Sequence, residues 1–458
     1  AAGAYRFRSE LRHAWDGAVR SGRAAYAVLR IGIDYKLHVA NLVEADPQYE
    51  ALRSAWHKRS AEQLLALCRA NGGVYIKLGQ HLAAMTYLLP PEWTETMRPL
   101  HARCPPTSMP DVAALIEKEM GQPMEALFRD FDPTPLGVAS LAQVHRATLV
   151  DGSVVAVKVQ HPPLQEHAVT DMASTSMLVH TVEYLFPEFG FGWLATEMEE
   201  NLPRELNFCV EQENAQRLRE CFAHDRGALV IPTVNWATPR VMCMEFIDGS
   251  HIDDREFMKK HRVDVNDVST ELTRVFADMI FKYGQVWAVW VHCDPHPGNI
   301  LIRSRKRRHL FDRNYDLVLL DHGLYRELPQ QLQSDYARLW RAILKRDEQG
   351  MRTYAMRIGG LDTHRLFACI LTGRSWSAVE SDLTQSRTQA ERDHVRGSLH
   401  RYLTDVADIL RRVPREVLLL IKTQDLLRSA DASLGAQRHP AYGLAVMMSA
   451  CNRAIRED

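Results

Sequence analysis

Two segments in the second half of the chain carry the residue types that phosphoryl transfer needs. Asp294 and Asn299 lie in His-Cys-Asp-Pro-His-Pro-Gly-Asn with four residues between them, and Asp321 follows an apolar run and opens Asp-His-Gly. One carboxylate can orient or deprotonate an acceptor, while an amide oxygen and a second carboxylate can hold Mg²⁺ against nucleotide phosphates. Each fragment alone is common in turns, but their order is specific. We therefore predict that Asp294 is catalytic and that Asn299 and Asp321 are metal ligands.

A lysine earlier in the chain fits the same chemistry. Lys158 ends the apolar run Val-Val-Ala-Val-Lys, close to the V-A-I-K pattern of protein kinases, whose lysine contacts the α- and β-phosphates. That geometry also requires a helix glutamate to pair with the lysine. We expect Glu211 in this role, with Glu213 as the nearby alternative.

The segments expected to hold the rest of a nucleotide are less regular. Residues 242–248 are interpreted as the strand and hinge beside the adenine ring, which makes Glu245 and Ile247 nucleotide-binding candidates. No G-x-G-x-x-G precedes Lys158. In its place a loop of small residues is expected to bring backbone N–H groups to the phosphates. Its members are Gly137, Val138, Ala139 and Ser140.

A different class of site uses the histidines of the same segments. Histidine and aspartate at short spacing are common metal ligands, and a metallohydrolase is the corresponding hypothesis. Its ligands would be His292, Asp294, His296 and His322. This hypothesis is the weaker one because it leaves Lys158 and Asn299 without roles.

The elements that must position these residues alternate between helical and β-rich stretches. Apolar periodicity, turn residues and β-branched runs predict helices over residues 1–70, 111–121, 167–185, 193–221, 249–283 and 330–458, and strands over residues 140–160, 229–231, 241–247, 300–303 and 317–320. A hairpin turn is expected at Asp151-Gly152. The fold class is therefore α+β, a protein-kinase-like bilobal fold with an added N-terminal helical region.

We expect four segments along the chain. They are an N-terminal helical segment at 1–70, a helical extension at 71–131, a kinase-like N-lobe with a helical insert at 132–248, and a mostly helical C-lobe at 249–458.

The composition of the chain limits which classes of partner and which cellular compartment we expect. A net charge of -1 gives no overall attraction to nucleic acid, so no nucleic-acid partner is expected. Eight cysteines without a C-x-x-C pair favour a reducing compartment. The sequence has no uninterrupted apolar run of about 18 residues, so we expect no transmembrane helix in it. Because the chain begins at Ala1, we expect that a leader was removed or not included.

The first 36 residues are rich in basic side chains. The acidic residues of this segment are only Glu10, Asp16 and Asp34, whereas its basic residues are Arg6, Arg8, Arg12, Arg20, Arg23, Arg30 and Lys36. A solvated helix face is one interpretation; the remnant of an organellar transit region or a membrane-surface helix is the other.

Four motifs over residues 73–325 together resemble the UbiB family, also called the aarF-domain-containing kinases. Lys77-Leu78-Gly79-Gln80 looks like the family's KxGQ motif, residues 137–140 resemble its alanine-rich loop, and Glu205-Leu206-Asn207 falls where the family carries ExD. The Asp294, Asn299 and Asp321 series completes the set. The N-terminal placement and the C-terminal helices look closest to the mitochondrial members.

The resemblance implies a nucleotide-binding protein that uses ATP or ADP with Mg²⁺. Its activity would be an ATPase or a small-molecule kinase in lipid or quinone metabolism, at the mitochondrial inner membrane, with membrane lipid or quinone-pathway proteins as partners. It also implies that the helical preamble covers the peptide-binding position, so proteins would not be phosphorylated in trans. The residues implied to regulate the site are Lys77, Gln80, Glu205 and Asn207.

Three departures from the family pattern bear on its activity, and two of them, Asn207 and the sequence at 285–290, favour an alternative, a nucleotide-sensing pseudokinase scaffold without turnover. Asn207 replaces an acidic residue, and Gly137-Val138 replaces two alanines. Residues 285–290 look like additional sequence ahead of His292, which would displace Asp294.

Overall fold

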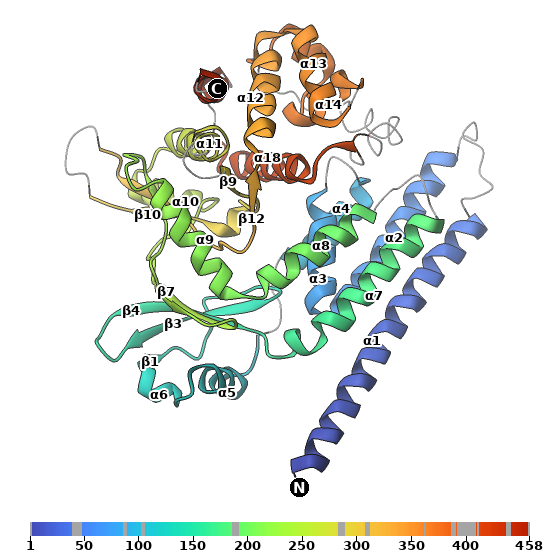
Figure 1. Ribbon diagram of the computed structural model, residues 1–458, viewed down its shortest axis with the longest axis vertical. Helices are drawn as coiled ribbons and strands as arrows, with labels where there is room; N and C mark the ends of the chain where they lie inside the picture. The colour runs from blue at the N-terminus through green and yellow to red at the C-terminus, as the bar shows by residue number, and fades with distance from the viewer. Residues whose placement is uncertain are drawn as a thin grey trace. The chain divides into compact units, whose positions relative to one another are not determined.

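The computed structural model forms two compact units along the chain (Figure 1). It describes residues 2–38, 48–85, 89–101, 106–185, 192–282, 289–306, 312–360, 362–385, 391, 409, 412–436 and 441–456. The first unit comprises residues 1–209 and 235–244, and the second comprises residues 210–234 and 245–458.

The N-terminal part of the first unit is a group of packed helices. The helices are α1 (Ala2–His38), α2 (Tyr49–Asn71), α3 (Gly73–Ala84), α4 (Pro91–Met97), α7 (Pro163–Leu185) and α8 (Gly192–Glu205), with a 3₁₀ turn at Arg98–His101. α1 packs against α2 and α7, and α3 packs against α2, α4 and α7. Gly72 and Gly73 both have positive φ, which lets the chain turn between α2 and α3 without strain.

The rest of the first unit is a twisted sheet backed by a helix. Its strands are β1 (Phe128–Phe131), β2 (Gly137–Val138), β3 (Ala142–Leu149), β4 (Val154–Gln160), β6 (Val234–Ala237) and β7 (Val241–Glu245). The order is β1-β3-β4-β7-β6, and β2 pairs with β3. The predicted hairpin is confirmed, because β3 and β4 pair antiparallel around Gly152, which has a φ of 89°.

One helix covers the face of this sheet opposite Lys158. Ser108 caps the N-terminus of α5 (Met109–Met120), because its hydroxyl oxygen accepts the Asp111 N–H, and the short α6 (Met124–Leu127) follows. Val155, Val157 and Val159 of β4 pack with α5 in one buried cluster. Because side chains alternate along a strand, Lys158 points to the other face of the sheet.

The second unit is mainly helical and carries two small sheets. Its helices are α9 (Phe208–Cys221, which begins at the boundary), α10 (Arg255–His261), α11 (Val265–Phe281), α12 (Gln330–Lys345), α13 (Glu348–Gly359), α14 (His364–Thr372), α15 (Trp376–Ser381), α18 (Arg415–Leu434) and α19 (Ala441–Arg456). One sheet has the order β5-β11-β10-β8 and the other pairs β12 with β9. The strands are β5 (Leu229–Val230), β8 (Ser250–His251), β9 (Val289–His292), β10 (Ile300–Ser304), β11 (Tyr315–Leu319) and β12 (Tyr325–Leu328).

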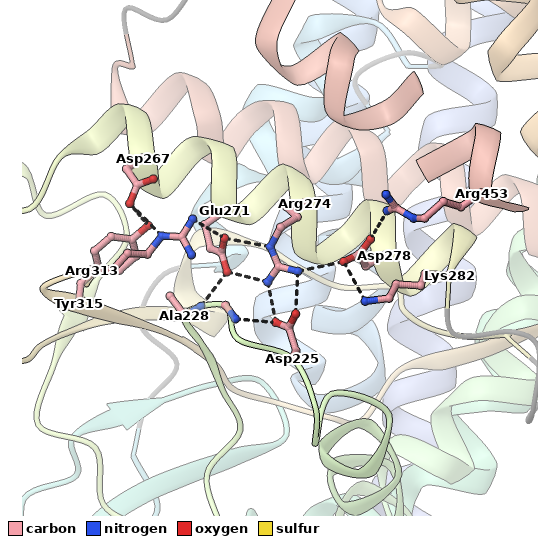
Figure 2. Close-up of polar contacts among 11 residues, drawn as sticks. Asp225, Ala228, Asp267, Glu271, Arg274, Asp278, Lys282, Arg313, Tyr315 and Arg453 are labelled. Atoms are coloured by element: carbon pink, nitrogen blue, oxygen red, sulfur yellow. Dashed lines mark hydrogen bonds and ion pairs between the residues drawn. The ribbon is translucent and has the colours of Figure 1, made fainter. Parts of the chain in front are cut away.

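A charge network on α11 joins several segments of the second unit (Figure 2). Arg274 donates to both carboxylate oxygens of Glu271 at 2.7 and 3.0 Å, to both of Asp225 at 2.7 and 3.1 Å, and to Asp278 at 2.9 Å. Burial opposes its charged form, but these carboxylates hold the pKa of Arg274 above its usual range. Glu271 also accepts from the Ala228 N–H at 2.8 Å and pairs with Arg313 at 3.0 Å. The network therefore ties α11 to the segments before β5 and β11.

Two of the predicted helices are wrong, because the structure breaks each of them into separate elements. Residues 193–221 form two helices, because Asn207 breaks the run and caps α9 by accepting the Cys209 N–H at 3.1 Å. Glu205 therefore ends α8, whereas Glu211 lies on α9. Residues 249–283 include β8 and two separate helices, α10 and α11, whose N-termini are capped by Asp254 and Asp264. No helix within the described segments is both long enough and apolar enough to cross a membrane.

Candidate functional site

The loop that carries Asp294 is held between two strands of the second unit. It follows β9, passes through the 3₁₀ turn Pro297–Asn299 and leads into β10. The buried Asn299 donates its side-chain N–H to the Asp294 carbonyl oxygen at 3.1 Å. This contact orients the Asn299 amide and fixes its distance from Asp294 along the loop.

Asp321 follows β11 in a backbone conformation that few residues adopt. Its φ is 53°, and its Oδ1 accepts the Gly323 N–H at 3.2 Å. Two other non-glycine residues of the described chain have positive φ, Arg262 and Arg346, and both end helices. Aspartate tolerates this region through local hydrogen bonds, and such strain is concentrated at functional sites. The conformation therefore supports a special role for Asp321.

His292 joins the two loops. Its Nδ1 accepts the Asp294 N–H at 3.2 Å, and its Nε2–H donates to the Asp321 carbonyl oxygen at 2.9 Å. The Leu320 N–H adds a backbone bond to the Asn299 carbonyl oxygen at 2.8 Å. Burial lowers the pKa of His292, which matches the neutral tautomer that these two bonds require. The structure thus brings Asp294, Asn299 and Asp321 together in one hydrogen-bonded pair of loops.

The same contacts argue against a histidine metal site. The Nδ1 and Nε2 atoms of His322 lie 2.7 Å from the Tyr325 hydroxyl and 3.1 Å from the Leu319 carbonyl oxygen, respectively. His292 also uses both ring nitrogens. Over the described residues, no group of three or more His, Cys, Asp or Glu side chains is arranged to hold a metal ion. The metallohydrolase hypothesis is therefore not supported.

α9 fixes the loop that carries Asp321. Glu211 accepts the His322 N–H at 3.2 Å, and Asn214 donates to the His322 carbonyl oxygen at 2.8 Å. Both side chains are buried. Glu211 belongs to the second unit and Lys158 to the first, so the ion pair expected between them stays a prediction.

Lys422 is a site residue that the sequence did not predict. Its Nζ lies 3.1 Å from Oδ1 of Asp294, and neither side chain is more than 22% exposed. It lies on α18, which is anchored by buried residues at 417–421 and by a hydrogen bond from Gln424 to the Tyr336 hydroxyl at 2.9 Å. In the sequence it is a single lysine after an apolar run, with no spacing that links it to Asp294.

In the first unit, Lys158 on β4 and Gly137 on β2 flank the same residue of β3, Val144. Lys158 pairs with Val144 across the hairpin, and its Nζ lies 5.1 Å from the centre of the Phe208 ring. Gly137 and Val138 form β2, so they are strand residues and not an open loop. The tight turn follows at Ala139, whose N–H bonds the Ala142 carbonyl oxygen at 2.8 Å.

The turn at Ala139 and Ser140 is supported from two sides. His161 Nε2 lies 3.0 Å from the Ala139 carbonyl oxygen, and the buried Ser140 hydroxyl lies 3.4 Å from Oε1 of Gln80. Gln80 also donates to the Leu100 carbonyl oxygen at 3.0 Å. These contacts connect the turn to α3.

The KxGQ segment forms part of α3 and contacts α8. Lys77 Nζ lies 2.6 Å from Oε2 of Glu205, and both side chains are largely buried. Gly79 is closely packed, since a Cβ there would collide with Cδ1 of Leu100 unless that side chain shifted. Lys77 and Gln80 therefore connect α3 to Glu205 of α8 and to the turn at Ser140, respectively, while Asn207 has the capping role described above.

The expected hinge residues have contacts of their own. The Glu245 N–H donates to the Thr233 carbonyl oxygen at 2.7 Å, and its carboxylate lies 3.4 Å from Arg303. Ile247 is buried. Their role toward adenine stays a prediction. Of the additional sequence expected at 285–290, residues 285–288 lie outside the described residues, and Val289 and Trp290 begin β9.

Comparison with known proteins identifies the family. A family model described as the ABC1 atypical kinase-like domain matches residues 99–355. The chain belongs to this family. It is 42% identical to the AarF domain-containing protein kinase 1 of Mus musculus over 444 residues, which cover 96% of this chain and 82% of that protein. It is 38% identical over 448 residues to the ABC1 family protein MCP2 homolog of Schizosaccharomyces pombe, covering 96% and 80%.

Family membership confirms the resemblance inferred from the motifs and the α+β, kinase-like fold. A solved complex of Rv3197 with erythromycin from Mycobacterium tuberculosis covers 79% of this chain and 94% of its own, with 20% identity and a TM-score of 0.47. As a member of the ABC1 family, the chain has a kinase-like fold of the general type that binds ATP.

Proposed function

We propose that this ABC1-family protein binds ATP or ADP with Mg²⁺ and transfers the terminal phosphoryl group of ATP to water or to a small-molecule acceptor. The observation that carries the proposal is the pair of loops in which His292 connects Asp294 to Asp321 and Asn299 bonds to Asp294. These are the groups that phosphoryl transfer requires, in the required order.

The residues present fit Mg²⁺. Asn299 and Asp321 offer an amide oxygen and a carboxylate, the hard ligands that this ion prefers. When bound, the ion would neutralise phosphate charge and align the terminal phosphoryl group. Asp321 is exposed and Asn299 is held by its N–H, so both can present oxygen to a ligand.

Asp294 would orient the attacking hydroxyl or water. In hydrolysis, the water oxygen bonds to the terminal phosphorus, the bond from that phosphorus to the ADP oxygen breaks, and the water proton passes to Asp294. The Lys422 ammonium, 3.1 Å from Asp294, would hold this carboxylate in place. Lys158 is proposed to contact the α- and β-phosphates, and Glu211 to orient it.

The acceptor is proposed to be a lipid or quinone-pathway compound and not another protein. Support comes from the UbiB resemblance and from α3, whose Lys77 and Gln80 are fixed to Glu205 and to the turn at Ser140. These contacts fix α3, the helix that carries the KxGQ motif, within the first unit. By the same resemblance we propose that the protein acts in mitochondria at the inner membrane, which fractionation of tagged protein would test.

A nucleotide sensor without turnover is the second candidate. The Lys422–Asp294 pair favours it, because an ammonium already occupies one oxygen of the proposed base. Asn207 no longer supports it strongly, since its capping bond to Cys209 is one that aspartate makes equally well.

Calorimetry and single-turnover hydrolysis on the full chain test these alternatives. We expect Mg²⁺-dependent binding of ATP and ADP, and hydrolysis that falls by a factor of about 100 or more in Asp294→Asn while nucleotide affinity changes by less than about threefold. Binding without hydrolysis in the wild type would support the sensor. Absence of nucleotide binding would contradict both candidates.

A further inference from the structure

α1 is apolar on two faces, and the fold covers only one of them. The inner face is buried at Ala24 and Ala27 and is fixed to α7 by the ion pair of Arg20 with Asp171 and by the bond between Ser21 and Ser174 at 2.7 Å. Figure 1 shows α2 and α7 lying along α1. This side accounts for the packing of the helix in the first unit.

The outer face of α1 carries a continuous line of large apolar side chains. Spacings of three, four and seven residues place them on one stripe of a helix. They are Trp15 (70% exposed), Val19 (36%), Tyr26 (61%), Leu29 (60%), Ile33 (49%) and Leu37 (70%). At 1.5 Å per residue the stripe is about 33 Å long. An exposed apolar surface of this extent marks a site of interaction, because isolated exposed residues do not align in this way.

The charges beside this stripe have one sign. Arg23, Arg30 and Lys36 are exposed along its edges. The two carboxylates of the same stretch are half-buried, and Asp34 is paired with Arg59 at 3.1 Å and His38 at 2.9 Å. The surface therefore combines apolar side chains with exposed cations and exposes no carboxylate between Trp15 and His38. An anionic partner is complementary to it, whereas a second copy of α1 would bring like charges together.

We propose that the outer face of α1 binds the surface of an anionic lipid bilayer, with the helix lying in the plane of the interface. Leu29, Ile33 and Leu37 would enter the boundary between headgroups and acyl chains, Trp15 and Tyr26 would lie at the headgroup level, and the cations would contact lipid phosphates. This inference is independent of nucleotide binding, since it uses no residue of the candidate site.

Flotation of the full chain with vesicles tests the proposal. Two vesicle compositions are compared, phosphatidylcholine alone and phosphatidylcholine with about one third phosphatidylglycerol. We expect at least tenfold more protein bound to the anionic vesicles, with binding that falls as NaCl is raised from about 0.05 to 0.5 M. In the double variant Leu29→Glu and Ile33→Glu the bound fraction should fall at least tenfold, because two carboxylates would enter the interface.

Matched controls separate this surface from a general increase in negative charge. Val150→Glu with Met356→Glu adds the same charge at exposed apolar residues elsewhere, where Val150 is 67% and Met356 45% exposed. This variant should bind like the wild type, and an unchanged unfolding midpoint would show that both variants are folded. Equal binding by the two double variants, or no binding to anionic vesicles, would overturn the proposal. Self-association that only the α1 variant abolishes would also overturn it, by assigning the face to a second copy.

Discussion

Two clusters of charge in the second unit differ in the cation that contacts their carboxylates. In the α11 network, Arg274 contacts three carboxylates, and Glu271 accepts from Arg274, Arg313 and the Ala228 N–H (Figure 2). At the candidate site, Nζ of Lys422 lies 3.1 Å from Oδ1 of Asp294. The first cluster is therefore built on a guanidinium that bonds several carboxylates at once, whereas in the second a lysine ammonium contacts a carboxylate.

The difference indicates different tasks. An arginine that bonds several carboxylates through pairs of parallel hydrogen bonds is held in one specific geometry. Such an arrangement suits a cluster that joins helix and strand segments. A lysine on a flexible stem forms a point contact that is more easily exchanged. We therefore expect Asp321 and the Lys422 contact to serve a ligand site, whereas the Arg274 network stabilises the fold.

Removal of Arg274 should give the largest effect on stability. Arg274→Met leaves the buried Glu271 and the half-buried Asp225 without their main partner, which we expect to cost about 3–5 kcal/mol. Urea unfolding measures this loss. Arg352→Met is the matched control, because the Arg352–Asp362 pair is more than 60% exposed on both sides and should contribute little. Similar unfolding midpoints for the two variants would contradict the structural role of the network.

Lys422 should affect turnover more than folding. We expect Lys422→Met to lower hydrolysis by about 10- to 100-fold, or about 1.4–2.8 kcal/mol, with nucleotide affinity nearly unchanged. Lys422→Arg should recover most of the rate, and its pH profile should follow the wild type. Lys345→Met, at an exposed lysine of α12, is the control. A rate for Lys422→Met equal to that of the wild type would remove Lys422 from the site.

Gly79 tests whether the KxGQ helix needs its close packing. In Gly79→Ala the new Cβ would collide with Cδ1 of Leu100 and lie 3.3 Å from Sγ of Cys68. Overpacking of this kind costs about 1–3 kcal/mol. Gly22→Ala on α1 has open space around it and should be neutral or slightly stabilising. Thermal unfolding of the two variants compares them, and equal stability would show that α3 can shift without loss.

A pH effect from His145 should be the smallest. Burial lowers the pKa of His145 below 6.5, and its ring nitrogens lie 2.8 Å from Gln143 Nε2 and from the Asp132 carbonyl oxygen. The unfolded chain therefore takes up the proton first, so this term favours folding above about pH 6.5 and is lost as pH falls through the lowered pKa. Between pH 7.5 and 5.5, the unfolding midpoint of His145→Gln should fall by roughly 2–4 °C less than that of the wild type. An equal fall in both would exclude His145 as a source of acid sensitivity.

The sequence was sufficient to predict the features that depend on residues close together in the chain. The Asp151-Gly152 hairpin, the strand that precedes Asp321, and the family follow from local pattern and motif order. The break at Asn207 was missed because helical composition continues across it, and the cap is a property of one side-chain bond. β8 and β9 were missed because strands so short depend on their partners for pairing.

Lys422 and the Arg274 network could not be predicted for a related reason. Lys422 meets Asp294 only because α18 packs against the 3₁₀ turn at Pro297–Asn299. Arg274 lies three and four residues from Glu271 and Asp278, a spacing that predicts helix pairs, but Asp225 comes from a distant segment. Partners far apart in sequence carry no spacing signal in one chain.

The central claim is that Asp321 holds Mg²⁺ for a nucleotide, and thermal unfolding with ATP or ADP, with and without Mg²⁺, tests it most directly. We expect saturating nucleotide with Mg²⁺ to raise the wild-type midpoint by several degrees, as about 2.7 kcal/mol of binding would. Asp321→Asn should keep its own midpoint and lose the shift, whereas Asp267→Asn, which loses contacts with Arg313 and Tyr315, should lower the midpoint and keep the shift. A full Mg²⁺-dependent shift in Asp321→Asn would contradict the account.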